Sequence, residues 1–345
     1  MSSSSKKLNY IDILNVLAAF AVIAMHVNLA YWNFRPAPSW VINTVIVKSL
    51  EWAVQVFYMI TGATLIGYIS RMSTAEYARR RIKHTLIPFF VWSLVILGLD
   101  MIVFGYVPFG NAPTYYMNLI FNTELPMGNA YWFFIPLFSI YLAIPVVTLI
   151  PEDKRIKAFS YLIFAYLLIK CAGEMLALFE INANPDLTMP LVGGWLLYPL
   201  AGYVLSRREF NKKERTALYA MGIVGWLTML VGTIVLSFRD GVTVHAFSAG
   251  TDWPKAVQAA AVFVFIKQFA GNHPKIAELR FWRWCSGLTF GTYLVHMVVI
   301  QAVLTIFNIN NASWWWSISG IPIVVILALG IVLALKRTPG IRKVL

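Results

Sequence analysis

The first apolar stretch of the chain contains a histidine that is the strongest candidate for chemistry. His26 stands 14 residues after Asp12, in a run near residues 9–31. At about 1.5 Å per residue, a helix would place His26 roughly 21 Å further along its axis than Asp12. A neutral imidazole can take a proton from a hydroxyl and later return it, which is general-base catalysis. The alternative interpretation is a histidine that only hydrogen-bonds neighbouring helices.

Four further ionisable residues lie within apolar runs, where charge is costly and often functional. Lys170 and Glu174 are four residues apart, so they face the same side of a helix and can pair. We expect a neutralising pair, with handling of a substrate or proton as the alternative. His296 and Asp100 stand alone in their runs, and packing or hydrogen bonding is the first interpretation for each.

A basic cluster stands directly before the apolar run near 85–106. It consists of Arg79, Arg80, Arg81 and Lys83. Guanidinium groups bind phosphate through two hydrogen bonds, and a lysine adds a point charge. The cluster therefore suits a nucleotide-bearing cofactor that approaches from the cytosol, although anchoring of a membrane span is an alternative. The sequence has no motif for a phosphate-binding loop, a dinucleotide fold, a serine hydrolase or a zinc protease.

Aromatic and amide side chains gather between residues 115 and 132, and they include Tyr131 and Trp132. Aromatic rings beside amides suit a sugar, which offers apolar C–H faces together with hydroxyl groups. An aromatic belt at the membrane interface is the alternative. Residues 107–130 contain several prolines and glycines, so we predict an irregular external segment there.

The composition of the chain indicates the type of structure that positions these residues. Hydrophobic residues make up 59% of the 345 residues and charged residues only 12%, against about 25% charged in a typical soluble domain. Soluble, disordered and coiled-coil classes are excluded. We predict one all-α polytopic membrane domain over residues 1–345, with about ten transmembrane helices that each cross roughly 30 Å of hydrocarbon. The apolar runs lie near 9–31, 51–70, 85–106, 131–150, 157–180, 191–206, 217–238, 256–271, 285–307 and 315–335.

The net charge of +13 indicates topology rather than nucleic-acid binding. With ten spans and a cytoplasmic N-terminus, 23 of the 28 lysines and arginines fall in cytoplasmic segments. Basic residues accumulate on that side of a membrane. Both termini are therefore predicted to be cytoplasmic. The two cysteines, Cys171 and Cys285, do not make a disulfide framework.

Five segments, in order along the chain, resemble the acyltransferase-3 family of integral membrane enzymes. The resemblance is greatest to its enterobacterial-common-antigen O-acetyltransferase-like branch. The segments are Tyr10-Ile-Asp-Ile-Leu-Asn-Val-Leu-Ala with Ala24-Met25-His26; residues 56–62; Arg81-Ile-Lys with residues 87–92; residues 131–134 with 141–145; and Gly287-Leu-Thr-Phe-Gly-Thr-Tyr-Leu-Val-His296. The family's first-span signature is an arginine followed after ten residues by a histidine. Asn15 stands at that arginine position.

The resemblance implies about ten spans and transfer of an acyl group, commonly acetyl from acetyl-CoA, to sugars of surface glycans. It implies that His26 is a catalytic base or acyl acceptor, and that Asp12 orients a base or contacts the cofactor. An amide cannot replace a permanent cation at a phosphate. Either a base such as Lys7 or Arg81 compensates for Asn15, or this chain handles its donor differently or has diverged in activity.

We therefore expect a membrane O-acyltransferase, first of all an O-acetyltransferase, in the plasma membrane of a bacterium. The donor would be acetyl-CoA or another acyl-CoA bound by the basic cluster, and no metal or nucleic acid is expected. The acceptor would be a glycan or lipid-linked sugar, with Tyr131, Trp132 and His296 as binding residues. The main alternative is a transporter or flippase without acyl-transfer chemistry, compatible with ionisable residues in the spans. A non-catalytic membrane scaffold is the third.

Overall fold

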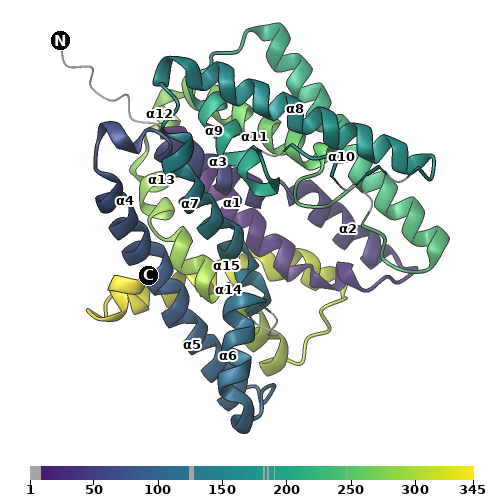
Figure 1. Ribbon diagram of the computed structural model, residues 1–345. Coiled ribbons are helices and arrows are strands. Elements are labelled where there is room, and N and C mark those ends of the chain that lie inside the picture. The colour runs from purple at the N-terminus through teal and green to yellow at the C-terminus, as the bar shows by residue number, and fades with distance from the viewer. Residues whose placement is uncertain (1–8, 124–127, 182, 185, 190, 246) are drawn as a thin grey trace.

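The computed structural model describes residues 9–345 except 124–127, 182, 185, 190 and 246. The regular elements in this described part are helices, and they form one bundle (Figure 1). The helices are α1 (Asn9–Val27), α2 (Pro38–Leu50), α3 (Ala53–Leu65), α4 (Thr74–Arg81), α5 (Ile87–Ile102), α6 (Ala112–Phe121), α7 (Phe134–Val147), α8 (Glu152–Leu178), α9 (Leu197–Arg207), α10 (Lys212–Asp240), α11 (Trp253–Asn272), α12 (Pro274–Ala277), α13 (Arg280–Ser286), α14 (Thr289–Ile306) and α15 (Trp314–Leu335). The predicted all-α membrane bundle is confirmed.

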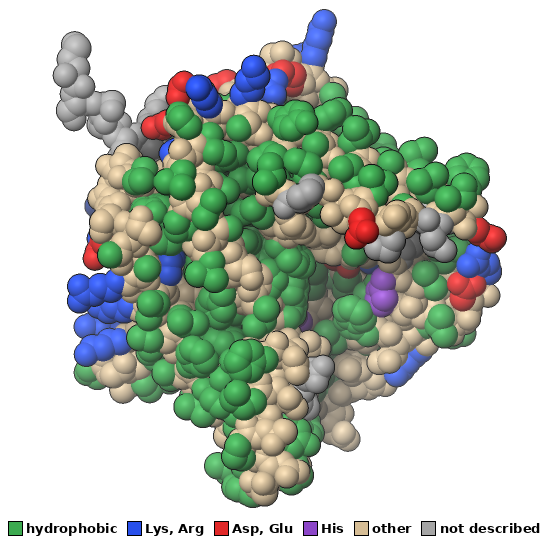
Figure 2. Space-filling view, in the orientation of Figure 1, with side chains coloured by type: hydrophobic (Ala, Val, Ile, Leu, Met, Phe, Trp, Pro, Cys, Tyr) green, Lys and Arg blue, Asp and Glu red, His purple; other side chains and the backbone are tan. Residues whose placement is uncertain are grey.

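Eight helical segments among the described residues are long and apolar enough to cross a membrane. Two runs that the sequence analysis expected to span, 191–206 and 256–271, correspond to α9 and α11 and are not among the eight. Helix α9 has only 11 residues. Helix α11 has 20 residues, but lysine and glutamine side chains interrupt its apolar sequence. Apolar side chains cover much of the face in Figure 2, as contact with lipid requires.

The structure differs from the predicted topology between residues 32 and 50. This stretch lies between two of the predicted spans, 9–31 and 51–70, whereas Pro38–Leu50 forms α2 and the candidate span runs from Pro38 to Ser70. Lys48 interrupts the apolar pattern there, although the folded chain buries it completely. Similarly, the segment 107–130 contains the helix α6 and is not irregular throughout, and its residues 124–127 lie outside the described part.

Helix α1 runs through the middle of the bundle (Figure 1). It packs against α2, α3, α11, α13, α14 and α15. Leu14, Val22, Ile23 and Ala24 point to four different sides of the helix, and each is at most 2% exposed. A helix that is apolar on all sides is stable only when other helices surround it. The sequence of α1 therefore fixes its central position and carries His26 into the interior.

Helices α3 and α9 cross in direct backbone contact because two glycines allow it. A methyl group added at Gly62 would lie 1.8 Å from the carbonyl oxygen of Pro199. One added at Gly202 would lie 1.9 Å from the carbonyl oxygen of Met59. Small residues at a crossing let two membrane helices approach closely. This crossing packs the short helix α9 against α3, which in turn contacts α1.

Candidate active site

Two histidines from opposite ends of the chain meet inside the bundle. His26 lies in the last turn of α1 and His296 in the middle of α14. Nε2 of His296 is 3.2 Å from Nδ1 of His26, and the ring centroids are 4.9 Å apart. Their positions in the sequence predict separate roles, catalysis for His26 and packing or substrate binding for His296. The structure brings them together as a hydrogen-bonded pair.

Backbone carbonyls decide which ring nitrogens carry hydrogen. Nδ1 of His296 is 2.5 Å from the carbonyl oxygen of Tyr293, and Nδ1 of His26 is 2.9 Å from that of Val22. A carbonyl oxygen only accepts hydrogen bonds, so both Nδ1 atoms carry hydrogen when the rings are neutral. His296 then offers the lone pair of Nε2 to the hydrogen on His26. Nε2 of His26 also has a lone pair, and it has no protein partner among the described residues.

The two histidines differ in accessibility. His296 is completely buried, whereas His26 is only partly buried. His26 is therefore the member of the pair that a substrate can touch, and His296 lies behind it. The free Nε2 of His26 has the chemistry of a general base or of a nucleophile.

A continuous series of aromatic rings leads from the histidine pair to Trp132. Neighbouring ring centroids are between 4.9 and 5.7 Å apart along the series. The rings, in order, belong to His296, Tyr293, Phe133, Tyr58, Trp195 and Trp132. Four of them, from Tyr293, Phe133, Trp195 and Trp132, are partly exposed. Figure 2 shows that this face of the molecule is hollowed between α8 and α6, with acidic and histidine side chains at the hollow.

The two neighbouring aromatic residues predicted to bind substrate have different surroundings. Tyr131 is 1% exposed, and its hydroxyl donates to the carbonyl oxygen of Leu294. It therefore fixes the 3-10 segment Gly128–Phe133 to α14, and its burial leaves no surface for a substrate. Trp132 is partly exposed beside Trp195. Its contact with a substrate remains a prediction.

The basic cluster divides into exposed residues and one residue that faces the bundle. Arg79, Arg80 and Lys83 are exposed, and Nε of Arg80 lies 2.8 Å from Glu76 Oε1. Arg81 is partly buried, and its guanidinium group lies 5.5 Å from the ring centroid of Tyr141. Its Nε is buried and has no hydrogen-bond partner among the described residues. Arg81 is thus the member of the cluster with a donor available inside the protein.

Helix α1 places Asn15 on the same side as His26, because 11 residues make about three turns. The Asn15 amide donates to Ser286 Oγ over 3.3 Å. Asp12 is partly buried nearly four turns from His26. At roughly 21 Å along the helix, Asp12 is too far away to orient that imidazole. A contact between Asp12 and a cofactor remains a prediction.

Two groups of ion pairs lie within or beside the bundle, and local sequence spacing predicts only the pair of Lys170 and Glu174. The expected pair of Lys170 and Glu174 exists, with 4.0 Å between Nζ and Oε1. Lys170 is closer to Asp252, at 3.2 Å. A second group joins Lys48 to Glu51 at 3.1 Å and Lys255 to Glu51 at 3.4 Å. The contacts of Lys170 with Asp252 and of Lys255 with Glu51 join distant parts of the chain, and no local sequence pattern indicates them.

Two other ionisable residues, Asp100 and His245, have contrasting surroundings. Asp100, expected to pack or hydrogen-bond, is completely buried, and neither carboxylate oxygen has a partner among the described residues. His245, for which no role is predicted from the sequence, lies in the loop between α10 and α11, with Nδ1 2.8 Å from Tyr31 Oη. Partial burial lowers the pKa of His245, and the positive charges of Lys48 and Lys255 lower it further.

Comparison with known families gives one match. The model of the acyltransferase-3 family, described as an acyltransferase domain, matches residues 8–333. No curated protein and no solved structure matches the chain. The matched range contains both histidines, the basic cluster and the aromatic series.

Proposed function

The chain belongs to the acyltransferase-3 family of multi-pass membrane proteins, and on this basis we propose that it transfers an acyl group from cytoplasmic acyl-CoA to a sugar hydroxyl. The observation that supports this proposal most is the His26–His296 pair. It leaves one unengaged imidazole nitrogen, on an accessible side chain, in the interior of a membrane bundle. The acceptor would be a surface glycan or its lipid-linked precursor.

In the proposed reaction, Nε2 of His26 takes the proton of the sugar hydroxyl while the hydroxyl oxygen attacks the thioester carbonyl carbon. The C–S bond breaks, an ester forms, and the thiolate of CoA leaves with the proton that His26 returns. General-base assistance of this kind contributes roughly 10²–10⁴-fold in rate. His296 Nε2 accepts the hydrogen on Nδ1 of His26, so it stabilises the positive charge that His26 carries between the two proton transfers. A two-step route through an acylated His26 uses the same nitrogen.

On the donor side, Arg81 supports binding of the CoA phosphates. Its unpartnered Nε faces the protein interior, and three exposed cations lie within four residues of it. The phosphates carry several acceptor oxygens, which suit guanidinium donors. The family's first-span arginine is replaced here by Asn15, whose amide is engaged with Ser286. In this proposal Arg81 takes over the cationic role.

On the acceptor side, the rings from Trp132 to Tyr293 support binding of a sugar. Rings that are partly exposed can stack on the apolar C–H faces of a sugar while its hydroxyl approaches His26. We propose acetyl as the acyl group, as expected for the enterobacterial-common-antigen O-acetyltransferase-like branch, and the plasma membrane of a bacterium as the location.

The test uses the purified protein in proteoliposomes, with radiolabelled acetyl-CoA outside and lipid-linked glycan from bacterial membranes in the bilayer. We expect label in the glycan with the unaltered protein and at least a hundredfold less with His26→Ala. Mass spectrometry of surface glycans, with and without the chain in cells, identifies the acceptor. Wild-type-like acetylation by His26→Ala would remove the proposed role of His26. Movement of the glycan across the bilayer without incorporation of label would instead favour the transporter.

A further inference from the structure

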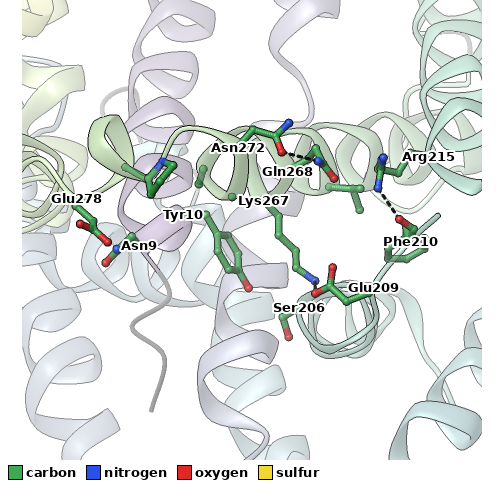
Figure 3. A pocket seen from close by; sticks show the side chains of 15 residues that line it. Asn9, Tyr10, Ser206, Glu209, Phe210, Arg215, Lys267, Gln268, Asn272 and Glu278 are labelled. Carbon is green, nitrogen blue, oxygen red and sulfur yellow. Dashed lines mark hydrogen bonds and ion pairs between the residues drawn. The ribbon is translucent and has the colours of Figure 1, made fainter. Parts of the chain in front are cut away.

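A cavity of about 640 Å³ opens at the end of the bundle where α1 begins. Its walls come from the first residues of α1, the last residues of α9 and α11, and the segment that leads into α10 (Figure 3). The volume is within the usual range for small-molecule sites. Tyr10, Ser206, Phe210, Arg215, Lys267 and Gln268 are among its lining residues.

The cavity lies on the other side of α1 from the histidine pair. Each residue turns a helix by about 100°, so Tyr10 and His26, 16 residues apart, point in directions about 160° apart. Asn15, by contrast, points within about 20° of His26. A ligand in this cavity therefore occupies a place separate from the proposed path to His26.

Tyr10 brings an unused donor to the cavity. The residue is 6% exposed, and its hydroxyl makes no hydrogen bond of good geometry among the described residues, although the side chain of Ser206 lies close enough to interact with it. A buried hydroxyl without a well-formed hydrogen bond is costly, because it has lost its hydrogen bonds to water. A ligand with an acceptor atom in the cavity would remove that cost.

Lys267 brings a largely buried cation to the cavity, and the side chain of its acidic partner is exposed to solvent. The Lys267 side chain is 16% exposed, and its ammonium group donates to the carbonyl oxygens of Leu205 and Arg208. It also pairs with Glu209 at 3.1 Å, yet the Glu209 side chain is 91% exposed. In Figure 3 this carboxylate reaches back to Lys267 from the edge of the cavity. The Glu209 side chain can rotate away from Lys267 into the solvent at little cost, so another anion can take its place.

We propose that this cavity binds a phosphate group, which replaces the Glu209 carboxylate at Lys267 and accepts a hydrogen bond from Tyr10. Arg215 also lines the cavity, and only one of its guanidinium nitrogens, Nη1, has a hydrogen bond among the described residues, to the carbonyl oxygen of Phe210. The neighbouring chain adds positive charge that attracts anions. The nearby basic residues are Arg207, Arg208, Lys212 and Lys213. A free phosphate ester and a phospholipid headgroup share this chemistry.

The test measures binding to the full-length protein in nanodiscs. Titration with inorganic phosphate and with AMP, in phosphatidylcholine nanodiscs, reports a free ester. Retention of phosphatidylglycerol over phosphatidylcholine, followed by native mass spectrometry, reports a lipid headgroup. We expect at least one probe to bind, with Lys267→Gln weakening it at least tenfold and Tyr10→Phe several-fold. Glu209→Gln should tighten it several-fold, because the competing carboxylate is gone.

Two further variants control the test. Arg239→Gln removes an exposed positive charge at the far end of α10 and should change binding less than twofold. His26→Ala should leave phosphate binding unchanged. Phosphate binding and acyl transfer are therefore tested independently of each other. Tighter binding by Glu209→Gln cannot arise from misfolding. Absence of binding by all three probes at millimolar concentration, or equal binding by the unaltered protein and the Glu209→Gln and Lys267→Gln variants, would overturn the proposal.

Discussion

Nδ1 of His26 and Nε2 of His296 lie 3.2 Å apart, although 270 residues separate them in the sequence. Each ring is also oriented by a carbonyl of its own helix, one turn earlier. The hydrogen on His26 can therefore reach either the Val22 carbonyl or His296. As positive charge develops on His26, the hydrogen bond to His296 strengthens, because a charged donor makes the stronger bond.

This relationship predicts that His296 acts through His26 and is a positioning residue. His296→Phe keeps a ring of similar size but removes the acceptor nitrogen. We expect kcat for acetyl transfer to fall roughly 10-fold to 100-fold, as for a lost hydrogen bond of about 1.5–3 kcal/mol to a charged group. KM for acetyl-CoA should stay within twofold. His296→Gln, which keeps an acceptor, should recover part of the rate, and a fully active Phe variant would refute the role.

Arg81 should differ sharply from its neighbour Arg80. Because the Arg81 Nε is buried and unpartnered, Arg81→Gln should raise KM for acyl-CoA about tenfold or more by removing a charge-assisted contact. Arg80→Gln is the matched control, since Arg80 is exposed and paired with Glu76. Its KM should change less than twofold. Equal effects of the two substitutions would show that the cluster acts only by overall charge.

The crossing of α3 and α9 predicts a steric effect on stability. Gly62→Ala would place a methyl group against the Pro199 backbone, so the two helices must separate. We expect the free energy of unfolding to fall by at least about 2 kcal/mol. Overpacking usually costs about 1–3 kcal/mol, and the loss exceeds this range if the backbone cannot shift. Thermal denaturation in detergent measures it. Gly98→Ala in α5 meets no atom within 4 Å and serves as the control, with equal or slightly higher stability.

The three-residue ion network predicts an unequal effect of removing its members. Glu51 faces both Lys48 and Lys255, so Glu51→Gln leaves two buried cations without an anion. Loss of one partner of a buried ion pair costs about 3–5 kcal/mol. Lys48→Met leaves the pair of Glu51 and Lys255 intact and should cost less. Unfolding in denaturant compares the two, and a greater loss for Lys48→Met would contradict this account of the network.

The amino-acid sequence alone determined the class of the protein and singled out His26 as a candidate for chemistry. Long apolar runs with little charge must become buried or lipid-facing helices, because hydrocarbon offers no partners for an open backbone. Hydropathy is a local property, so the helices could be predicted nearly in place. His26 was recognisable for the same reason, as an ionisable group within such a run. The ordered segments from Tyr10 to His296 identified the family that the comparison confirmed.

Tertiary structure alone decided which side chains meet. His296 pairs with His26, and Tyr131 is buried while Trp132 is partly exposed, because of how α1, α14 and the segment before α7 pack. Lys48 interrupted an apolar run and therefore resembled a loop residue, yet Glu51 offsets its charge inside the protein. Contacts between distant helices depend on how the helices cross, as where Gly62 approaches the backbone of Pro199. Local hydropathy does not predict this crossing geometry.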